Sequence, residues 1–255
     1  MLSIVSCSSL QAWQQDSFVL PKIRELKLYA NKDYVDQLAF LGREYLNTPG
    51  VRTIKISPKS RRYLKSIFNR VCENSELILK LSQRPTFHII KSRKPFYFSL
   101  PGSQFFLSSG LVLSFLKNEH LLVAALSHEI VKSQKSIYLK KAVVPIGFLS
   151  TEKMLALTSL PLKIKMEVNK WTFYVLKRAG YDSTAYLNWL QTQNKNTLDF
   201  IFQLGSGKQI SREEFLFKNF IVKQGILNRR NEKSAPSNSS QDFYRLVNEI
   251  GRNRT

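Results

Sequence analysis

Cysteine, glycine, proline and acidic residues are all scarce in this chain of 255 residues, and each scarcity excludes a class of protein. Two cysteines, Cys7 and Cys72, cannot build a disulfide scaffold, and their separation fits no zinc-finger spacing. Ten glycines and nine prolines are too few for a collagen-like or low-complexity protein. A hydrophobic fraction of 43% excludes wholesale disorder. The chain therefore has room for one large globular domain or two small ones.

The shortage of acidic residues leaves 18 Asp and Glu against 39 Lys and Arg, a net charge of +21. Such an excess predicts contact with an anionic partner, which could be nucleic acid, phospholipid head groups or an acidic protein. No helix-turn-helix or aromatic RNA-binding motif is present, so an anionic membrane surface is favoured over nucleic acid. The alternative is that the basic residues only form a solvated helix face. The candidates for a continuous basic patch are Arg61, Arg62, Lys65, Arg70 and Lys80.

The first residues contain a second localisation signal. Ile4-Val5-Ser6-Cys7 resembles the lipobox that precedes a lipid-modified cysteine in bacterial lipoproteins. A secretory signal also needs a basic start and a longer apolar stretch, and neither precedes this motif. One interpretation is that residues 1–18 are a truncated signal or lipoprotein N-terminus, with Cys7 lipidated and the protein in the periplasm or at the outer membrane. The other is a chance match on a frayed end of a cytoplasmic protein.

Long apolar runs are also missing. The most apolar stretch, residues 142–162, is interrupted by Pro145, Glu152, Lys153 and Pro161. A transmembrane helix needs about 20 mostly apolar residues. This stretch therefore predicts two short buried or interfacial pieces.

Hydrophobic periodicity predicts a mainly helical α+β protein with a small sheet. Ser57-Pro58 is typical of a helix start, Gly180 of a helix end, and the polar segment 231–240 of a linker. The expected domain spans 19–230, and 231–255 forms a linker and a short helix. The predicted helices are 33–47, 57 onward, 110–116, 118–138, 163–179, 186–191, 213–222 and 242–250, and the predicted strands are 86–90, 96–100 and 104–107.

One pair of residues has the pattern of a chemical site. His128-Glu129 lies inside an apolar, helical stretch, as in zinc peptidases of the HExxH type. In those enzymes two histidines one turn apart bind the metal, and the glutamate takes a proton from the metal-bound water.

The residues around this pair make the pattern more specific. In chain order they are Ser99-Leu100-Pro101-Gly102, Phe106 to Leu111, Asn118-Glu119, Ala124 to Ile130, Glu167, and Ala179-Gly180-Tyr181-Asp182. Together they resemble zinc peptidase family M forty-eight, which includes the HtpX, CAAX prenyl, Oma and BepA proteases. The family pattern runs N-A-F-A-L-P-G-G, then N-E-x-E-L-A-A-V-L-G-H-E-I-G-H, E-x-x-A-D and A-G-Y-D-P. The resemblance implies a zincin-like (gluzincin) fold with a small sheet beside the active-site helix.

The resemblance also assigns roles to single residues. His128 and Glu167 occupy metal-ligand positions, and Glu129 occupies the general-base position. The strand segment Phe105, Phe106 and Leu107 is the expected cleft edge, to which an extended protein or peptide partner could add by backbone pairing.

Several positions depart from the family pattern. The second histidine is replaced by Lys132, and the aspartate expected four residues after Glu167 is Trp171. An ammonium group has no lone pair for a metal.

His120 lies eight residues before His128, about 80° around the helix and two turns away, so the two cannot share one zinc ion. His88 is a weaker candidate still. The sequence therefore predicts that no catalytic zinc is bound. Zinc is the expected cofactor only in the alternative that the site is functional. It also predicts a Lys132–Glu167 ion pair, with Glu129 as a further partner; the alternative is that Lys132 extends to the cleft mouth.

Three functions remain open at this stage. The first is a catalytically impaired zinc endopeptidase relative that acts as a binding, scaffold or quality-control protein of the bacterial envelope. The second is an active metalloendopeptidase with a non-standard metal site. The third is a basic protein that binds anionic membranes or nucleic acid.

Overall fold

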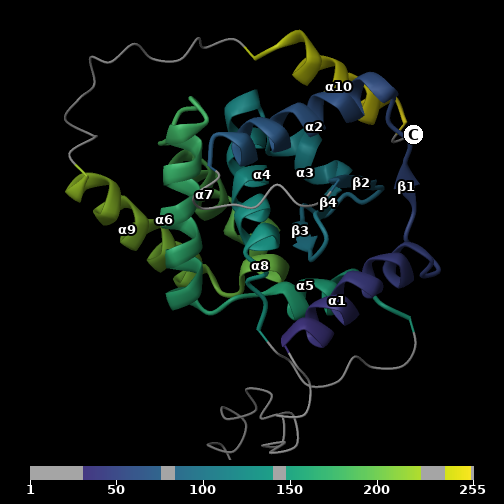
Figure 1. Cartoon of the computed structure of the whole chain (residues 1–255), viewed down its shortest axis with the longest axis horizontal. Coiled ribbons are helices and arrows are strands. Elements are labelled where there is room, and N and C mark those ends of the chain that lie inside the picture. Colours follow the sequence, from purple (N-terminus) through teal and green to yellow (C-terminus); the bar gives the residue numbers. More distant parts are fainter. Residues whose placement is uncertain (1–30, 76–83, 140–147, 225–238, 254–255) are drawn as a thin grey trace, which may run out of the picture.

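The computed structural model describes residues 31–75, 84–139, 148–224 and 239–253. The protein is mainly helical, with one small mixed sheet (Figure 1). The helices are α1 (Asn31–Leu46), α2 (Pro58–Glu73), α3 (Ser109–Ser114), α4 (Glu119–Gln134), α5 (Thr151–Thr158), α6 (Leu162–Arg178), α7 (Ala185–Lys195), α8 (Thr197–Leu204), α9 (Gly207–Lys223) and α10 (Gln241–Arg252). The strands are β1 (Thr53–Ile54), β2 (Thr86–Ile90), β3 (Tyr97–Leu100) and β4 (Gln104–Ser108).

Most predicted elements are present, and local signals explain their ends. Ser57 caps α2 by accepting a hydrogen bond from the Ser60 amide, with Pro58 in the first turn. Gly180 follows α6 with a φ of 68°, the left-handed conformation that favours glycine. Helix α4 ends at Gln134, earlier than predicted, and Ser136 just beyond it has a φ of 50°. Strand β1 and helices α5 and α8 were not predicted.

The sheet order is β1-β2-β4-β3. Strand β2 pairs with β4 in parallel, and β3 pairs with β4 in antiparallel orientation. Strand β4 therefore has neighbours on both sides, and the prediction that Phe105, Phe106 and Leu107 form the cleft edge is wrong. The physical reason is the short turn at Gly102, which folds β3 back onto β4 and leaves β3 as the outer strand.

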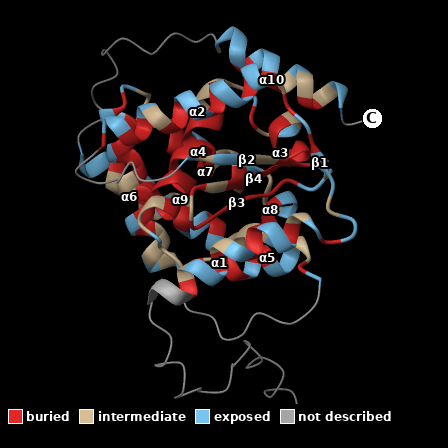
Figure 2. Cartoon of the chain, turned by 45° about the vertical axis from the view of Figure 1, so that its right-hand side comes forward, coloured by how far each residue is buried: buried red, intermediate tan, exposed pale blue. Residues whose placement is uncertain are grey.

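The sheet separates two apolar clusters. Alternate side chains of β3 and β4, Phe98 and Phe106, stack at 4.7 Å between ring centroids and face α1 and α5. The opposite face, with Tyr97 and Phe105, contributes to the larger cluster under α2, α4, α6 and α7. Figure 2 shows that α4 is buried along its length, in contrast to the outer helices. The polar side chains of its central part, those of Ser127, His128, Glu129, Lys132 and Ser133, are thus held inside the protein.

The remaining predictions about the chain ends and surface have mixed outcomes. Cys7, segment 1–18, Lys80 and most of the linker 231–240 lie outside the described residues. Of the helices that are described, none is long and apolar enough to span a membrane. Arg70 does not extend freely from the predicted basic patch, because its guanidinium donates to the carbonyls of Ala179 and Gly180 at the end of α6.

Candidate functional site

The site is centred on Glu129, a buried carboxylate on α4. Its Oε2 accepts hydrogen bonds from Lys132 Nζ at 2.7 Å and from Ser99 Oγ at 2.6 Å. Its Oε1 lies 3.2 Å from His128 Nδ1. Ser99 lies on β3, so this carboxylate joins the outer strand of the sheet to the central helix. All three partners hold Glu129 in its ionised form.

The Lys132 ammonium is the main counter-charge of this carboxylate. Lys132 and Glu129 are three residues apart on α4, and both side chains are only 5% exposed. Burial alone raises the pKa of Glu129, but the charge of Lys132 and the hydrogen bond from His128 together outweigh burial and lower the pKa to about 2. The general-base position of the family pattern is therefore occupied by a carboxylate of very low basicity.

His128 is held in place by its neighbours. Its ring stacks on the ring of Tyr186 from α7, with the centroids 5.2 Å apart and the planes nearly parallel. Nδ1 contacts Glu129, whereas Nε2 is buried and has no hydrogen-bond partner among the described residues. This nitrogen is therefore a buried polar atom of α4 with unused hydrogen-bonding capacity among the described residues.

A second buried ion pair lies across the cavity. Lys165 Nζ of α6 lies 3.3 Å from Glu213 Oε2 of α9. The other oxygen of Glu213 accepts a 2.9 Å hydrogen bond from the Asn169 side-chain amide. Lys165 and Asn169 are one helical turn apart, so α6 presents both to the site from one face.

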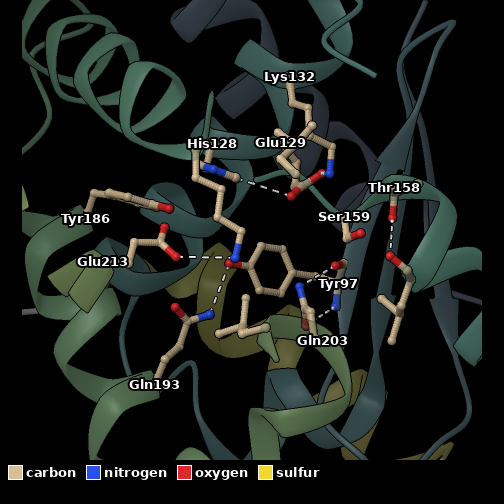
Figure 3. Close-up of a pocket in the computed structure, with 14 residues that line it drawn as sticks. Tyr97, His128, Glu129, Lys132, Thr158, Ser159, Tyr186, Gln193, Gln203 and Glu213 are labelled. Atoms are coloured by element: carbon tan, nitrogen blue, oxygen red, sulfur yellow. Dashed lines mark hydrogen bonds and ion pairs between the residues drawn. The ribbon is translucent and has the colours of Figure 1, made fainter. Parts of the chain in front are cut away.

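Both ion pairs line one small cavity. Its volume is about 40 Å³, which is room for a few water molecules, and Tyr97, Tyr186, Gln193 and Gln203 complete its polar wall. In Figure 3, His128, Glu129 and Lys132 lie on one side of the cavity, and Tyr97, Gln193 and Gln203 lie on the other.

A larger groove of about 420 Å³ adjoins the cavity. The two share part of their lining, including Lys165, Gln203 and Glu213. The groove is otherwise mostly apolar, with Leu155, Leu160, Pro161, Leu162, Ile201, Phe202 and Leu204 along its walls. Of the two ion pairs, the groove reaches the one between Lys165 and Glu213.

The structure places one predicted site residue elsewhere. The Glu167 side chain is 54% exposed and pairs with Lys170 at 2.7 Å on the protein surface. The predicted Lys132–Glu167 ion pair is therefore wrong, and Lys132 pairs with Glu129 instead. The reason is helical geometry: Lys165 faces the site, and Glu167 lies about 200° further around α6.

The donor atoms of the site do not fit a zinc ion. Catalytic zinc needs three protein ligands and an open position. In the parts of the chain that the structure describes, no three His, Cys, Asp or Glu side chains are grouped to hold a metal ion. Two ammonium groups, those of Lys132 and Lys165, also line the same cavity and would repel a cation.

Several residues of the site escaped prediction. Lys165, Glu213, Tyr97, Gln193 and Gln203 line the cavity, and none belongs to the motif around His128. One usable signal was present, because Lys165 and Asn169 have the helical spacing that puts them on the same face of α6 as the buried Thr172 and Phe173. The residues of α7 to α9 carry no local motif.

The decrease in unfolding free energy at acid pH should depend on the Glu129 carboxylate. Because its pKa is lowered to about 2 in the folded protein, the unfolded chain binds the proton first as the pH falls below about 4.5. The contribution is fully present above that pH and is lost as the pH falls toward 2. We expect Glu129 to account for a loss of about 2 kcal/mol in unfolding free energy between about pH 6 and pH 3.

Urea unfolding at the two pH values measures this effect. The Glu129→Gln variant should lose about 2 kcal/mol less than the native protein over the same interval. Glu44→Gln is the matched control, because Glu44 is an exposed carboxylate on α1. Equal pH dependence in the native protein and Glu129→Gln would show that the carboxylate is not held ionised by Lys132.

Comparison with known proteins adds no assignment for this site. No model of a known protein family matches the chain, and no curated protein sequence matches it. The resemblance to family M forty-eight thus depends on the sequence motifs alone. The function has to be argued from the residues of the cavity and the groove.

Proposed function

We propose that this protein is a catalytically silent relative of the zinc endopeptidases, which binds extended polypeptide without hydrolysing it. The observation that carries the proposal is the 2.7 Å ion pair between Lys132 and Glu129. Lys132 takes the position of the second metal-binding histidine, and its ammonium neutralises the carboxylate that would act as the general base. Lysine at this one position thus removes a metal ligand and also pairs with the carboxylate of the general-base position.

The second ion pair supports the same proposal. In the family pattern E-x-x-A-D, the metal-binding Glu and the Asp are four residues apart. Lys165, which lines the cavity, and Asn169, which donates to the cavity residue Glu213, are also four residues apart on α6. In this proposal Lys165, rather than Glu167, occupies the third-ligand position. Lysine then replaces a metal ligand at both positions, and each lysine is neutralised by a carboxylate.

The fold is consistent with a zincin-like framework. A small sheet lies beside the buried helix that carries His128 and Glu129, and its outer strand β3 contacts that helix through Ser99. Substrate-like binding needs only the outer strand and the groove, neither of which depends on a metal. Loss of the catalytic centre is therefore compatible with retained binding.

An extended polypeptide is the ligand that fits the groove best. The groove has the volume for several side chains, its walls are mostly apolar, and it adjoins the cavity that Tyr97 of the outer strand β3 lines. Backbone pairing to that strand would supply affinity with little dependence on sequence, and the apolar walls would select side chains. The +21 charge favours acidic chains.

The test uses reduced, carboxymethylated α-lactalbumin as an unfolded acidic polypeptide. We expect the native protein to bind it, measured by fluorescence anisotropy, and to leave it intact after prolonged incubation with added zinc. Arg61→Gln/Arg62→Gln removes two positive charges from the α2 surface, outside the groove lining, and should retain binding. Cleavage that is abolished by Glu129→Gln would overturn catalytic silence, and absence of binding would overturn the binding role.

One observation favours an active metalloendopeptidase with a non-standard site as a second candidate. The Nε2 atom of His128 is buried without a partner, and Glu213 lines the same cavity. An ion bound by these two groups would have to displace Lys165 from Glu213. The cleavage assay decides between the two candidates, because only this one requires hydrolysis that depends on His128.

A further inference from the structure

The outer edge of β3 is occupied by a side chain of the same protein. The backbone amide of Tyr97 donates to Gln203 Oε1 at 3.1 Å, and Gln203 Nε2 donates to the Tyr97 carbonyl at 2.6 Å. Figure 3 shows the Gln203 carboxamide beside Tyr97 at the cavity wall. Both backbone groups that Tyr97 directs away from β4 are thus satisfied by one carboxamide.

This arrangement reproduces the pairing of an added strand. A carboxamide carries the same donor and acceptor as a peptide group, and two hydrogen bonds to one residue are what a hydrogen-bonded antiparallel pair makes. An incoming polypeptide would need the amide and carbonyl of Tyr97 for its own pairing. Gln203 and such a polypeptide therefore compete for the same two atoms.

The helix that carries Gln203 is loosely held. Of the residues of α8, only Phe200 is buried, packed against Phe115 and Trp189. Three large apolar side chains, Leu198, Ile201 and Phe202, are exposed, and Leu198 is 84% exposed. Elements with few buried contacts open locally at low free-energy cost. Displacement of α8 is therefore feasible without unfolding the core.

We propose that Gln203 is an internal latch, which mimics a bound peptide and must leave Tyr97 before an extended polypeptide can pair with β3. This inference rests on the proposed binding function and adds its regulation. Gln203 and Leu204 line both the cavity and the groove, so movement of α8 opens the outer edge of β3 and the inner end of the groove together. The latch weakens binding because only molecules with an open latch can bind. The apparent Kd of the native protein is the intrinsic Kd divided by the fraction of molecules in which the latch is open.

The experiment compares the native protein with Gln203→Ala and with Gln241→Ala. Gln241 is an exposed glutamine at the start of α10 that lines neither the cavity nor the groove, which makes it the matched control. In Gln203→Ala the Tyr97 amide should exchange with deuterium about tenfold faster, since it loses its hydrogen-bond acceptor. Binding of reduced, carboxymethylated α-lactalbumin should become about tenfold tighter, with no change in net charge. Gln241→Ala should behave as the native protein does in both measurements.

The outcomes separate the latch from the binding function. Equal affinity in the native protein and Gln203→Ala would overturn the latch and leave the binding function in place. Unchanged exchange of the Tyr97 amide would also overturn the latch, because the two hydrogen bonds would not be protecting it. Failure of all three proteins to bind the probe would overturn the binding function, and the latch with it.

Discussion

Lys132→Met should lower the free energy of unfolding by about 3–5 kcal/mol. The substitution removes the ammonium group but preserves much of the side-chain volume, so cavity formation contributes little. It leaves Glu129, which is only 5% exposed, without its counter-charge inside the protein. The pKa of Glu129 then rises, because burial raises it and the charge of Lys132 no longer lowers it. Protonation of the carboxylate limits the loss of unfolding free energy. Urea unfolding at neutral pH measures the change.

Two further variants isolate the ion pair. Glu129→Gln in the Lys132→Met background should recover more than half of the lost stability, because a neutral amide no longer requires a counter-charge and can still accept from Ser99. Lys170→Met is the control for an exposed pair, since Lys170 and Glu167 are three residues apart on the surface. It should cost less than about 1 kcal/mol. A loss in Lys132→Met no larger than in Lys170→Met would show that the buried pair is not what holds the site together.

Lys132→His combined with Lys165→Glu should create a zinc site where the described residues group no three metal ligands. The two changes place an imidazole one turn after His128 and a carboxylate on the face of α6 that borders the cavity, giving three ligands of the types that zinc prefers. They also remove both ammonium groups. Zinc in excess should raise the melting temperature of the double variant by about 5 °C or more, because a metal that binds the folded state and not the unfolded chain stabilises the folded state.

The single variants show which residue of α6 faces the metal. Lys132→His alone retains the Lys165 ammonium in the cavity and should show no zinc-dependent shift. Lys132→His with Lys165→Gln removes that charge without adding a ligand and should bind only weakly. A zinc-dependent shift in Lys132→His that disappears when Glu167→Gln is added would mean that Glu167, and not position 165, points to the metal.

Local signals in the sequence were sufficient for much of the fold. The cap formed by Ser57 with Pro58 located the start of α2, and Gly180 located the end of α6. The apolar run around His128 correctly indicated a buried helix, since α4 is packed on all sides. Each of these features depends on interactions within a few residues, which a single sequence displays directly.

The features that were missed depend on contacts between distant segments. Strand order was one: nothing local to Phe106 indicates that β2 pairs in parallel on one side while β3 pairs on the other. The buried face of α6 was another such feature. Lysines at 163, 165 and 170 are distributed around the helix, so the charge pattern does not indicate which face is buried. Helix α8 is short and exposes apolar residues, so its pattern resembles a strand as much as a helix.

The partner of Lys132 could not be predicted for the same reason. Glu129 on α4 itself and Glu167 on α6 were both available as acidic partners, and the choice depends on how α6 is rotated against α4. The structure resolves it in favour of the residue three positions away. The sequence singled out Lys132, which the structure places at the cavity beside Glu129, but its predicted main partner was wrong.

Metal content of the native protein is the most direct test of the central claim, that lysine has closed a zinc-peptidase-like centre. The protein is purified without chelator and analysed by inductively coupled plasma mass spectrometry, with the Lys132→His/Lys165→Glu variant in parallel. We expect far less than one zinc per chain in the native protein and about one in the variant. Zinc near one per chain in the native protein, lost in His128→Ala, would contradict the account.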